Sequence, residues 1–124
     1  MKTNMSPLEL ALKYMKIFYS GKDLDDLYQL FSNEFSFKGP YFEFDRAEEY
    51  INSLKSDPPV GLEYSIIQSY ENATSACLVY QFLKSGVSIP MAQQFDVSNG
   101  KIDKILLIFD AGTFSYNDEN LAKE

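Results

Sequence analysis

The sequence contains no histidine, so acid–base chemistry in this protein would depend on other side chains. Histidine is the base of Ser-His-Asp and Cys-His catalysis and the commonest ligand of zinc and non-haem iron sites, and its absence removes these possibilities. Proton transfer would fall to Asp, Glu, Tyr or Lys. Nine Tyr and ten Phe occur among 124 residues. Because a phenol adds a polar hydroxyl to a large apolar ring, this composition is typical of an aromatic core or an aromatic pocket lining.

Two carboxylates occupy positions where they could act as a base. Glu43 lies between Phe42 and Phe44 and could place a carboxylate at the mouth of an aromatic cavity. It also lies two residues before a helix cap, where a solvated glutamate is ordinary. Asp110 ends a strongly apolar segment and could be a pocket acid, or it could cap the turn at residues 111–112. The sequence leaves both alternatives open for each residue.

The charge and composition limit the classes of partner. Eighteen acidic against eleven basic residues give a formal net charge of −7, and such a surface repels nucleic-acid phosphates and anionic lipid. No apolar stretch approaches the ~20 residues that span a bilayer. Asp23, Asp25 and Asp26 are interpreted as helix-start residues, which the helix dipole favours, so neither a metal nor a cofactor is expected. The single Cys77 and the lack of a signal-peptide core predict a cytoplasmic protein.

Three helices are predicted in the first half of the chain. The first begins with a capping box at residues 6–9, in which Ser6 caps and Glu9 closes the box, and it ends at Gly21. Asp23 is expected to cap a second, shorter helix, and Asp45 a third that ends before Pro58. The inward residues of these helices are Ala11, Tyr14, Met15, Phe18, Leu24, Leu27, Leu30, Phe31, Ala47, Tyr50, Ile51 and Leu54.

The second half of the chain alternates with the period of β-strands. Short strands at 35–38 and 41–44 precede the third helix, and long strands follow at about 62–70, 74–84, 87–97 and 101–110. Four long strands joined by tight turns predict an antiparallel meander packed under the helices, which is an α+β fold. The length suits a single domain over residues 1–124, with an ordered core at about 6–114 and a polar tail at 115–124.

The last long strand is apolar on both faces. Ile105, Leu107 and Phe109 point one way, and Leu106 and Ile108 point the other. A strand that is apolar on both faces is covered on both faces. Since the helices cover one face, we expect a second copy of the chain on the other, giving a homodimer through the sheet face.

The order of elements resembles the nuclear transport factor 2-like (NTF2-like) superfamily, over about residues 6–114. Residues 14–31 resemble the opening of ketosteroid isomerase, which is a tyrosine, six residues, a glycine and a short acidic helix ending in leucine–phenylalanine. Phe109-Asp110-x-x-x-Phe114 resembles the ending of SnoaL-like polyketide cyclases, with one more intervening residue. The resemblance implies a cone of three helices on a curved sheet, but the superfamily includes both enzymes and non-catalytic binders, so fold does not imply function.

The resemblance also implies roles for single residues. Tyr14 matches the isomerase tyrosine that donates a hydrogen bond to the developing enolate. The catalytic base falls on Gly39, and the second oxyanion donor, a protonated aspartate, corresponds to Gln93. Glycine supplies no base, and an amide can donate a hydrogen bond but cannot transfer a proton. Ketosteroid isomerase activity itself is therefore not expected.

A pocket between the helices and the sheet follows from the same resemblance. If Gln93 faces this pocket, strand alternation places Ile89, Met91, Phe95 and Val97 on the same face. Gln93 would then either anchor a ligand together with Tyr14 or satisfy its amide internally. The expected ligand-contacting residues are Tyr14, Gln93, Met91, Phe95, Phe18, Phe37, Leu107 and Phe109.

Three functions remain open from the sequence. The first is a pocket that binds a small hydrophobic molecule, such as a polycyclic or aromatic metabolite. The second is a lyase, cyclase or isomerase that acts on a small cyclic substrate, with Glu43 or Asp110 as the base and with Tyr14 and Gln93 orienting the substrate. The third is a dimeric interaction module with a vestigial pocket.

Overall fold

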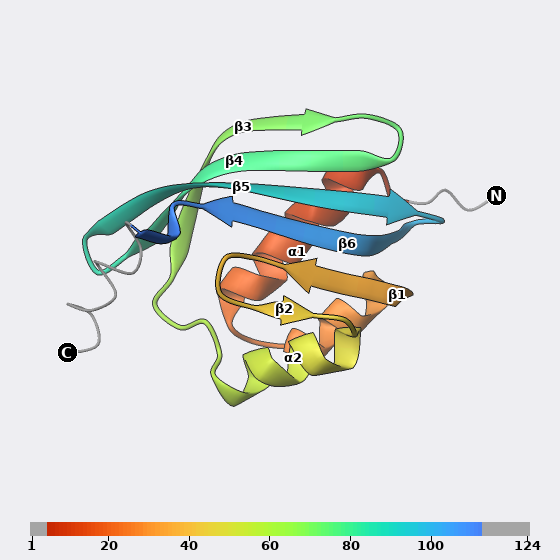
Figure 1. The fold of residues 1–124 in the computed structure, drawn as a ribbon, viewed down its shortest axis with the longest axis horizontal. Helices are drawn as coiled ribbons and strands as arrows, with labels where there is room; N and C mark the ends of the chain where they lie inside the picture. The colour runs from red at the N-terminus through yellow and green to blue at the C-terminus, as the bar shows by residue number, and fades with distance from the viewer. Residues whose placement is uncertain (1–4, 113–124) are drawn as a thin grey trace.

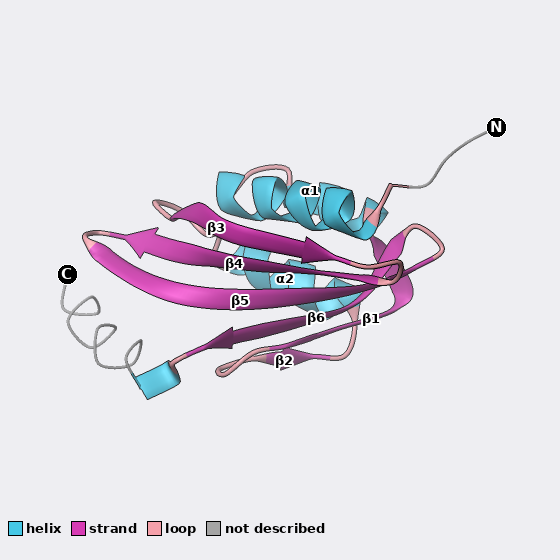
Figure 2. Cartoon of the chain, turned by 90° about the horizontal axis from the view of Figure 1, so that it is seen from above, coloured by secondary structure: helices cyan, strands magenta, loops and turns pink. Residues whose placement is uncertain are grey.

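The computed structural model describes residues 5–112 as helices packed on a six-stranded sheet (Figure 1). The sheet order is β2-β1-β6-β5-β4-β3, and both α-helices lie on one side of it (Figure 2). Phe114 and the predicted tail at 115–124 lie outside the described residues. The elements are α1 (Pro7–Ser20), η1 (Leu24–Gln29), β1 (Phe31–Lys38), β2 (Glu43–Phe44), α2 (Ala47–Ser56), β3 (Glu63–Glu71), β4 (Ser75–Lys84), β5 (Val87–Ser98) and β6 (Lys101–Phe109).

Helix α1 has the predicted ends. The backbone N–H of Glu9 donates to Ser6 Oγ at 3.2 Å, and the backbone N–H of Ser6 donates to Glu9 Oε1 at 2.8 Å, so the capping box is confirmed. Gly21 ends the helix with φ 68°, in the left-handed region. A Cβ at Gly21 would lie 2.8 Å from the carbonyl oxygen of Pro59. Glycine is therefore favoured there for space as well as for backbone angle.

The caps predicted for the other two helices are wrong. Asp23 has φ 53° and makes no side-chain cap hydrogen bond, and the segment after it is a 3-10 helix, η1. A side-chain cap requires an extended cap residue, which the left-handed Asp23 is not. Helix α2 begins one residue later than predicted, with Arg46 at the cap position and no side-chain cap. The predicted inward leucines of η1, Leu24, Leu27 and Leu30, are nevertheless buried.

The predicted meander is confirmed, because β3, β4, β5 and β6 pair antiparallel in sequence order. β1 is longer than predicted. Phe31 opens this strand instead of ending a helix, and β1 pairs parallel with β6. The backbone N–H of Ile102 donates to the carbonyl of Leu30 at 2.7 Å. Tertiary pairing with β6 thus determines the conformation at Phe31, where local helical spacing indicated otherwise.

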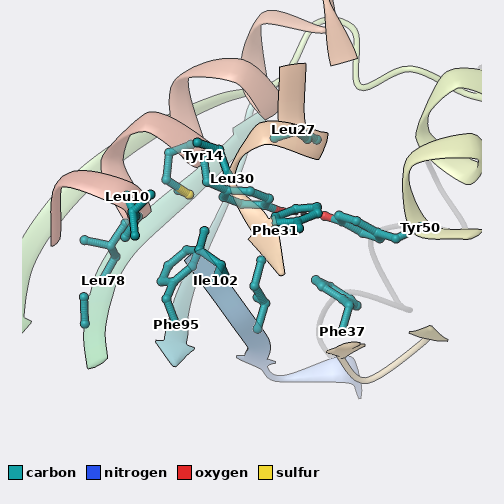
Figure 3. Close-up of a cluster of buried hydrophobic side chains, with 14 of the residues drawn as sticks. Leu10, Tyr14, Leu27, Leu30, Phe31, Phe37, Tyr50, Leu78, Phe95 and Ile102 are labelled. Atoms are coloured by element: carbon teal, nitrogen blue, oxygen red, sulfur yellow. Dashed lines mark hydrogen bonds between the residues drawn. The ribbon is translucent and has the colours of Figure 1, made fainter. Parts of the chain in front are cut away.

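The two faces of the sheet differ. On the inner face, toward the helices, β4 contributes the buried side chains of Ala76, Leu78, Tyr80 and Phe82. α1 packs against β3, β4 and β5, whereas α2 packs against β1 and η1. Figure 3 shows the resulting core, in which Tyr14 and Tyr50 extend toward each other from the two helices. No helix within residues 5–112 is long and apolar enough to cross a membrane.

Candidate functional site

A cavity of about 660 Å³ lies between the helices and the inner face of the sheet, and it is partly open to solvent. This volume is in the range of small-molecule sites. The lining is rich in aromatic side chains and comes from both helices, the β1–β2 connection, the segment after α2 and the strands β1, β2, β4, β5 and β6. It consists of Tyr14, Phe18, Tyr19, Phe37, Gly39, Pro40, Tyr41, Phe42, Phe44, Tyr50, Ser53, Leu54, Asp57, Pro58, Pro59, Val60, Leu62, Tyr80, Phe82, Lys84, Met91, Gln93, Leu107 and Phe109.

The polar part of this lining is a connected group of hydroxyls around one amide. The hydroxyl of Tyr80 donates to Gln93 Oε1 at 2.7 Å. The hydroxyls of Tyr14 and Tyr50 form a short hydrogen bond with each other, and Gln93 lies beside the Tyr14 hydroxyl and lowers its pKa. Gln93 is only 3% exposed and is the buried polar residue of this core. The Gln93 amide therefore lies between the Tyr80 hydroxyl on β4 and the hydroxyl pair of Tyr14 on α1 and Tyr50 on α2.

The donors and acceptors in this group can be assigned. Gln93 Oε1 accepts from Tyr80, and the amide nitrogen of Gln93 is the donor that can lower the pKa of Tyr14. Tyr14 and Tyr50 carry two hydroxyl protons, and the bond between them uses one. One O–H of the pair is left to donate into the cavity. The site thus offers a donor to a bound molecule and favours a hydrogen-bond acceptor, such as a carbonyl oxygen.

Burial holds these tyrosines in the neutral form. Loss of hydration raises the pKa of Tyr14 well above its usual value, the neighbouring Tyr50 raises it further, and the hydrogen bond from Gln93 lowers it. Burial likewise raises the pKa of Tyr50 and of Tyr80. It raises the pKa of Tyr19 to about 12, although a hydrogen bond with Tyr80 opposes the shift. At neutral pH the four hydroxyls act as hydrogen-bond donors and acceptors, and none is a phenolate base.

The two predicted carboxylates lie outside the lining. Glu43 is exposed in β2, opposite Lys38. Asp110 is exposed after β6, where its Oδ1 accepts from the backbone N–H of Gly112 at 3.0 Å, the turn-capping role that the sequence left open. Among the described residues, the carboxylate of the lining is that of Asp57, which is exposed at the end of α2. None of these carboxylates is buried beside the tyrosine hydroxyls.

The predicted ligand-contacting residues lie in the lining, with the exception of Phe95. The Phe95 ring is buried against that of Tyr14, with ring centroids 5.4 Å apart in an edge-on arrangement. Phe95 therefore packs against the Tyr14 ring and does not line the cavity. Gly39, where the resemblance places the isomerase base, lines the cavity; a Cβ there would lie 3.3 Å from Phe37 Cε1. The base position faces the cavity and carries no side chain.

Sequence reasoning missed the polar partners of Tyr14. Tyr50 was predicted only as part of the apolar face of its helix. The inward spacing of the helices places Tyr14 and Tyr50 toward one interior, which is the signal that could have paired them. Within the described residues, no group of three or more Cys, Asp or Glu side chains is arranged to hold a metal ion.

Comparison of the structure with solved structures identifies the fold. An NTF2-like protein of unknown function from Cytophaga hutchinsonii superimposes with a TM-score of 0.76 at 20% identity, covering 92% of this chain and 98% of that chain. A candidate ketosteroid isomerase from Kribbella flavida gives 0.71 at 12% identity, with 82% and 76% covered. A candidate SnoaL-like polyketide cyclase from Jannaschia sp. gives 0.68 at 12% identity, with 93% and 94% covered.

These similarities show that the chain has the NTF2-like α+β fold, as its order of elements predicts. The sequence matches no protein-family model and has no significant match among functionally curated proteins. At such low identity, the solved structures establish the fold and leave the chemistry of the cavity to be argued from its own residues.

Proposed function

We propose that this protein binds a small hydrophobic molecule in the cavity between its helices and its sheet. The observation that carries the proposal is a cavity of about 660 Å³ that the protein's own aromatic side chains line without filling. An aromatic wall with a few convergent polar groups is the usual composition of small-molecule sites. A flat ring system suits these walls, and its polar group would accept from the Tyr14–Tyr50 pair.

Catalysis by a lyase, cyclase or isomerase mechanism has less support. Proton abstraction needs a base of suitable pKa within hydrogen-bond reach of the substrate. Glu43 and Asp110 lie outside the lining, Asp57 is exposed, and Gly39 has no functional group. The buried hydroxyls could polarise the carbonyl of a bound substrate. Among the described lining residues, none places a base inside the cavity that could accept the substrate's proton. Binding is therefore the function that the residues favour.

The binding proposal is tested by filling the cavity. Leu107 faces the cavity from β6, and the adjacent Leu106 faces the opposite side of the sheet. A library of aromatic and polycyclic compounds is screened by thermal shift against the wild type, Leu107→Trp and the control Leu106→Trp. A ligand at a hundred times its Kd stabilises the folded state by about 2.7 kcal/mol. We expect hits that stabilise the wild type and Leu106→Trp but not Leu107→Trp. A library without hits, or hits that stabilise Leu107→Trp equally, would contradict the proposal.

The outer face of the sheet supports self-association as a second property. Val79, Ala92 and Ile108 lie side by side across β4, β5 and β6, and Ile108 is 54% exposed. The charged pair Asp96 and Lys104 lies toward one end of this face. Its centre is uncharged, so a second copy could cover it without burying an unpaired charge.

Self-association is tested by placing a charge on that centre. We expect the wild type to sediment as a dimer and Ile108→Asp as a monomer with an unchanged circular dichroism spectrum. Leu12→Asp, at an exposed residue of α1, is the control and should remain a dimer. A monomeric wild type would refute the proposed dimer without affecting ligand binding.

A further inference from the structure

Lys84 is the last of the β4 residues that line the cavity. Strand alternation places Tyr80, Phe82 and Lys84 in succession on the inner face of β4, and all three line the cavity. The Tyr80 hydroxyl donates to Gln93, and the buried Phe82 ring forms part of the apolar wall. At a rise of roughly 3.4 Å per residue, the Cα atoms of Tyr80 and Lys84 are about 13 Å apart. The cavity thus has hydroxyls at one end, an aromatic wall, and the residue Lys84 near the other end.

Lys84 forms no ion pair within the described part of the chain. The ion pairs among residues 5–112 are Arg46–Glu48 and Lys55–Asp25, and the Lys84 ammonium group takes part in neither. The Lys84 side chain is half-buried, so it has lost part of its hydration without gaining an ionic partner. Asp57, the other charged residue of the lining, is exposed at the end of α2 and forms no ion pair with Lys84.

We propose that the ligand is a hydrophobic carboxylic acid, whose ring system lies among the aromatic side chains and whose carboxylate binds Lys84. This inference rests on the proposed ligand-binding function. One ammonium group balances one negative charge. A phosphate monoester would bring nearly two charges to a protein of net charge −7, with Asp57 also on the lining. A monoanionic carboxylate matches the single lysine.

The test compares two probes of nearly the same shape. 2-Naphthoate and 2-naphthamide share a ring system and differ in charge, and their affinities are measured by isothermal titration calorimetry. We expect the wild type to bind the acid about fivefold more tightly than the amide, as one partly screened ion pair provides. Lys84→Met should remove this preference by weakening the binding of the acid. Lys16→Met, at an exposed position of α1, is the matched control and should keep the preference.

The outcomes separate this inference from the function on which it rests. Amide binding without a preference for the acid, or a preference that survives in Lys84→Met, overturns the carboxylate assignment and leaves hydrophobic binding standing. Equal loss of both probes in Lys84→Met shows a role in shape and also overturns it. Binding of neither probe to the wild type contradicts the proposed binding function as well.

Discussion

The Tyr80 hydroxyl and the Gln93 amide oxygen are joined by a hydrogen bond of 2.7 Å that fixes how the amide is oriented. With its oxygen toward Tyr80, Gln93 presents its NH₂ group to Tyr14. The amide thus connects a hydroxyl of the sheet to the pair of hydroxyls between the helices. A carboxylate at this position would only accept hydrogen bonds, whereas the amide both accepts and donates.

Replacing Gln93 should therefore destabilise the protein. Gln93→Leu leaves the buried Tyr80 hydroxyl without its acceptor, and an unsatisfied buried group costs about 1–3 kcal/mol. Urea unfolding monitored by circular dichroism measures the loss. The control is Gln81→Leu, on the outer face of the same sheet, whose Oε1 accepts from the exposed Ser88. We expect the control to change the free energy of unfolding by under about 0.5 kcal/mol. Equal losses in the two variants would show that the hydrogen bond to Tyr80 has no special role.

The buried tyrosines predict a specific instability in alkali. Burial raises the pKa of Tyr14, Tyr50 and Tyr80 above the usual value, and that of Tyr19 to about 12. Below pH 10 these residues are protonated in both states, so the stability they contribute is fully present. Above pH 10 the unfolded chain loses their protons first, and stability falls as the pH rises toward the folded-state pKa values.

The size of this effect can be measured. Each such tyrosine lowers the free energy of unfolding by about 1.4 kcal/mol per pH unit in this range. Urea unfolding between pH 8 and roughly pH 11 should give a flat region followed by a steep decline. Tyr80→Phe removes one titrating group and should make the decline shallower. A wild-type protein whose stability is constant across this range would show that its tyrosines ionise as easily when folded as when unfolded.

Gly21 provides a prediction about the junction between α1 and the segment after α2. Alanine at Gly21 would combine a left-handed backbone angle with a contact of 2.8 Å to the Pro59 carbonyl, whereas Gly86, at φ 82°, has nothing within 4 Å of its Cβ position. Gly86→Ala should therefore lower the free energy of unfolding by about 1–2 kcal/mol, the cost of a left-handed backbone angle for alanine. Gly21→Ala should cost more, because the Pro59 segment must also shift. Thermal unfolding compares the two, and equal losses would mean that this segment yields freely.

Sequence patterns predicted most of the fold because its signals are local. The capping box at Ser6 and the alternation of the four long strands depend on neighbouring residues, and both agree with the structure. Phe31 was misread because it pairs with Ile102 of the last strand, a tertiary contact that local spacing does not reveal. Asp23 was misread because its backbone is left-handed, with φ 53°.

The sequence predicted the apolar lining of the candidate site but not the hydrogen bonds among its polar side chains. Strand alternation places Met91 and Gln93 on one face, and helical spacing turns Tyr14 inward. The partnership of Tyr14 with Tyr50 joins residues on two helices, and that of Gln93 with Tyr80 joins two strands. No pattern within one element reveals which hydroxyls meet, so this arrangement emerges only when the elements are packed together.

The shared hydrogen bond of Tyr14 and Tyr50 leads to a prediction about ligand recognition, conditional on hydrophobic binding. In Tyr50→Phe, the proton of Tyr14 is free to donate into the cavity, and in Tyr14→Phe, the proton of Tyr50 is free. Either single variant should therefore still prefer 2-acetonaphthone over 2-ethylnaphthalene, which has a similar shape but no acceptor. The double variant combined with Gln93→Leu, which removes the amide donor as well, should lose this preference, about fivefold for one neutral hydrogen bond. Calorimetry with both probes measures the preference. Loss of the preference in only one of the single variants would assign the donor to that tyrosine alone. This outcome would contradict an interchangeable pair.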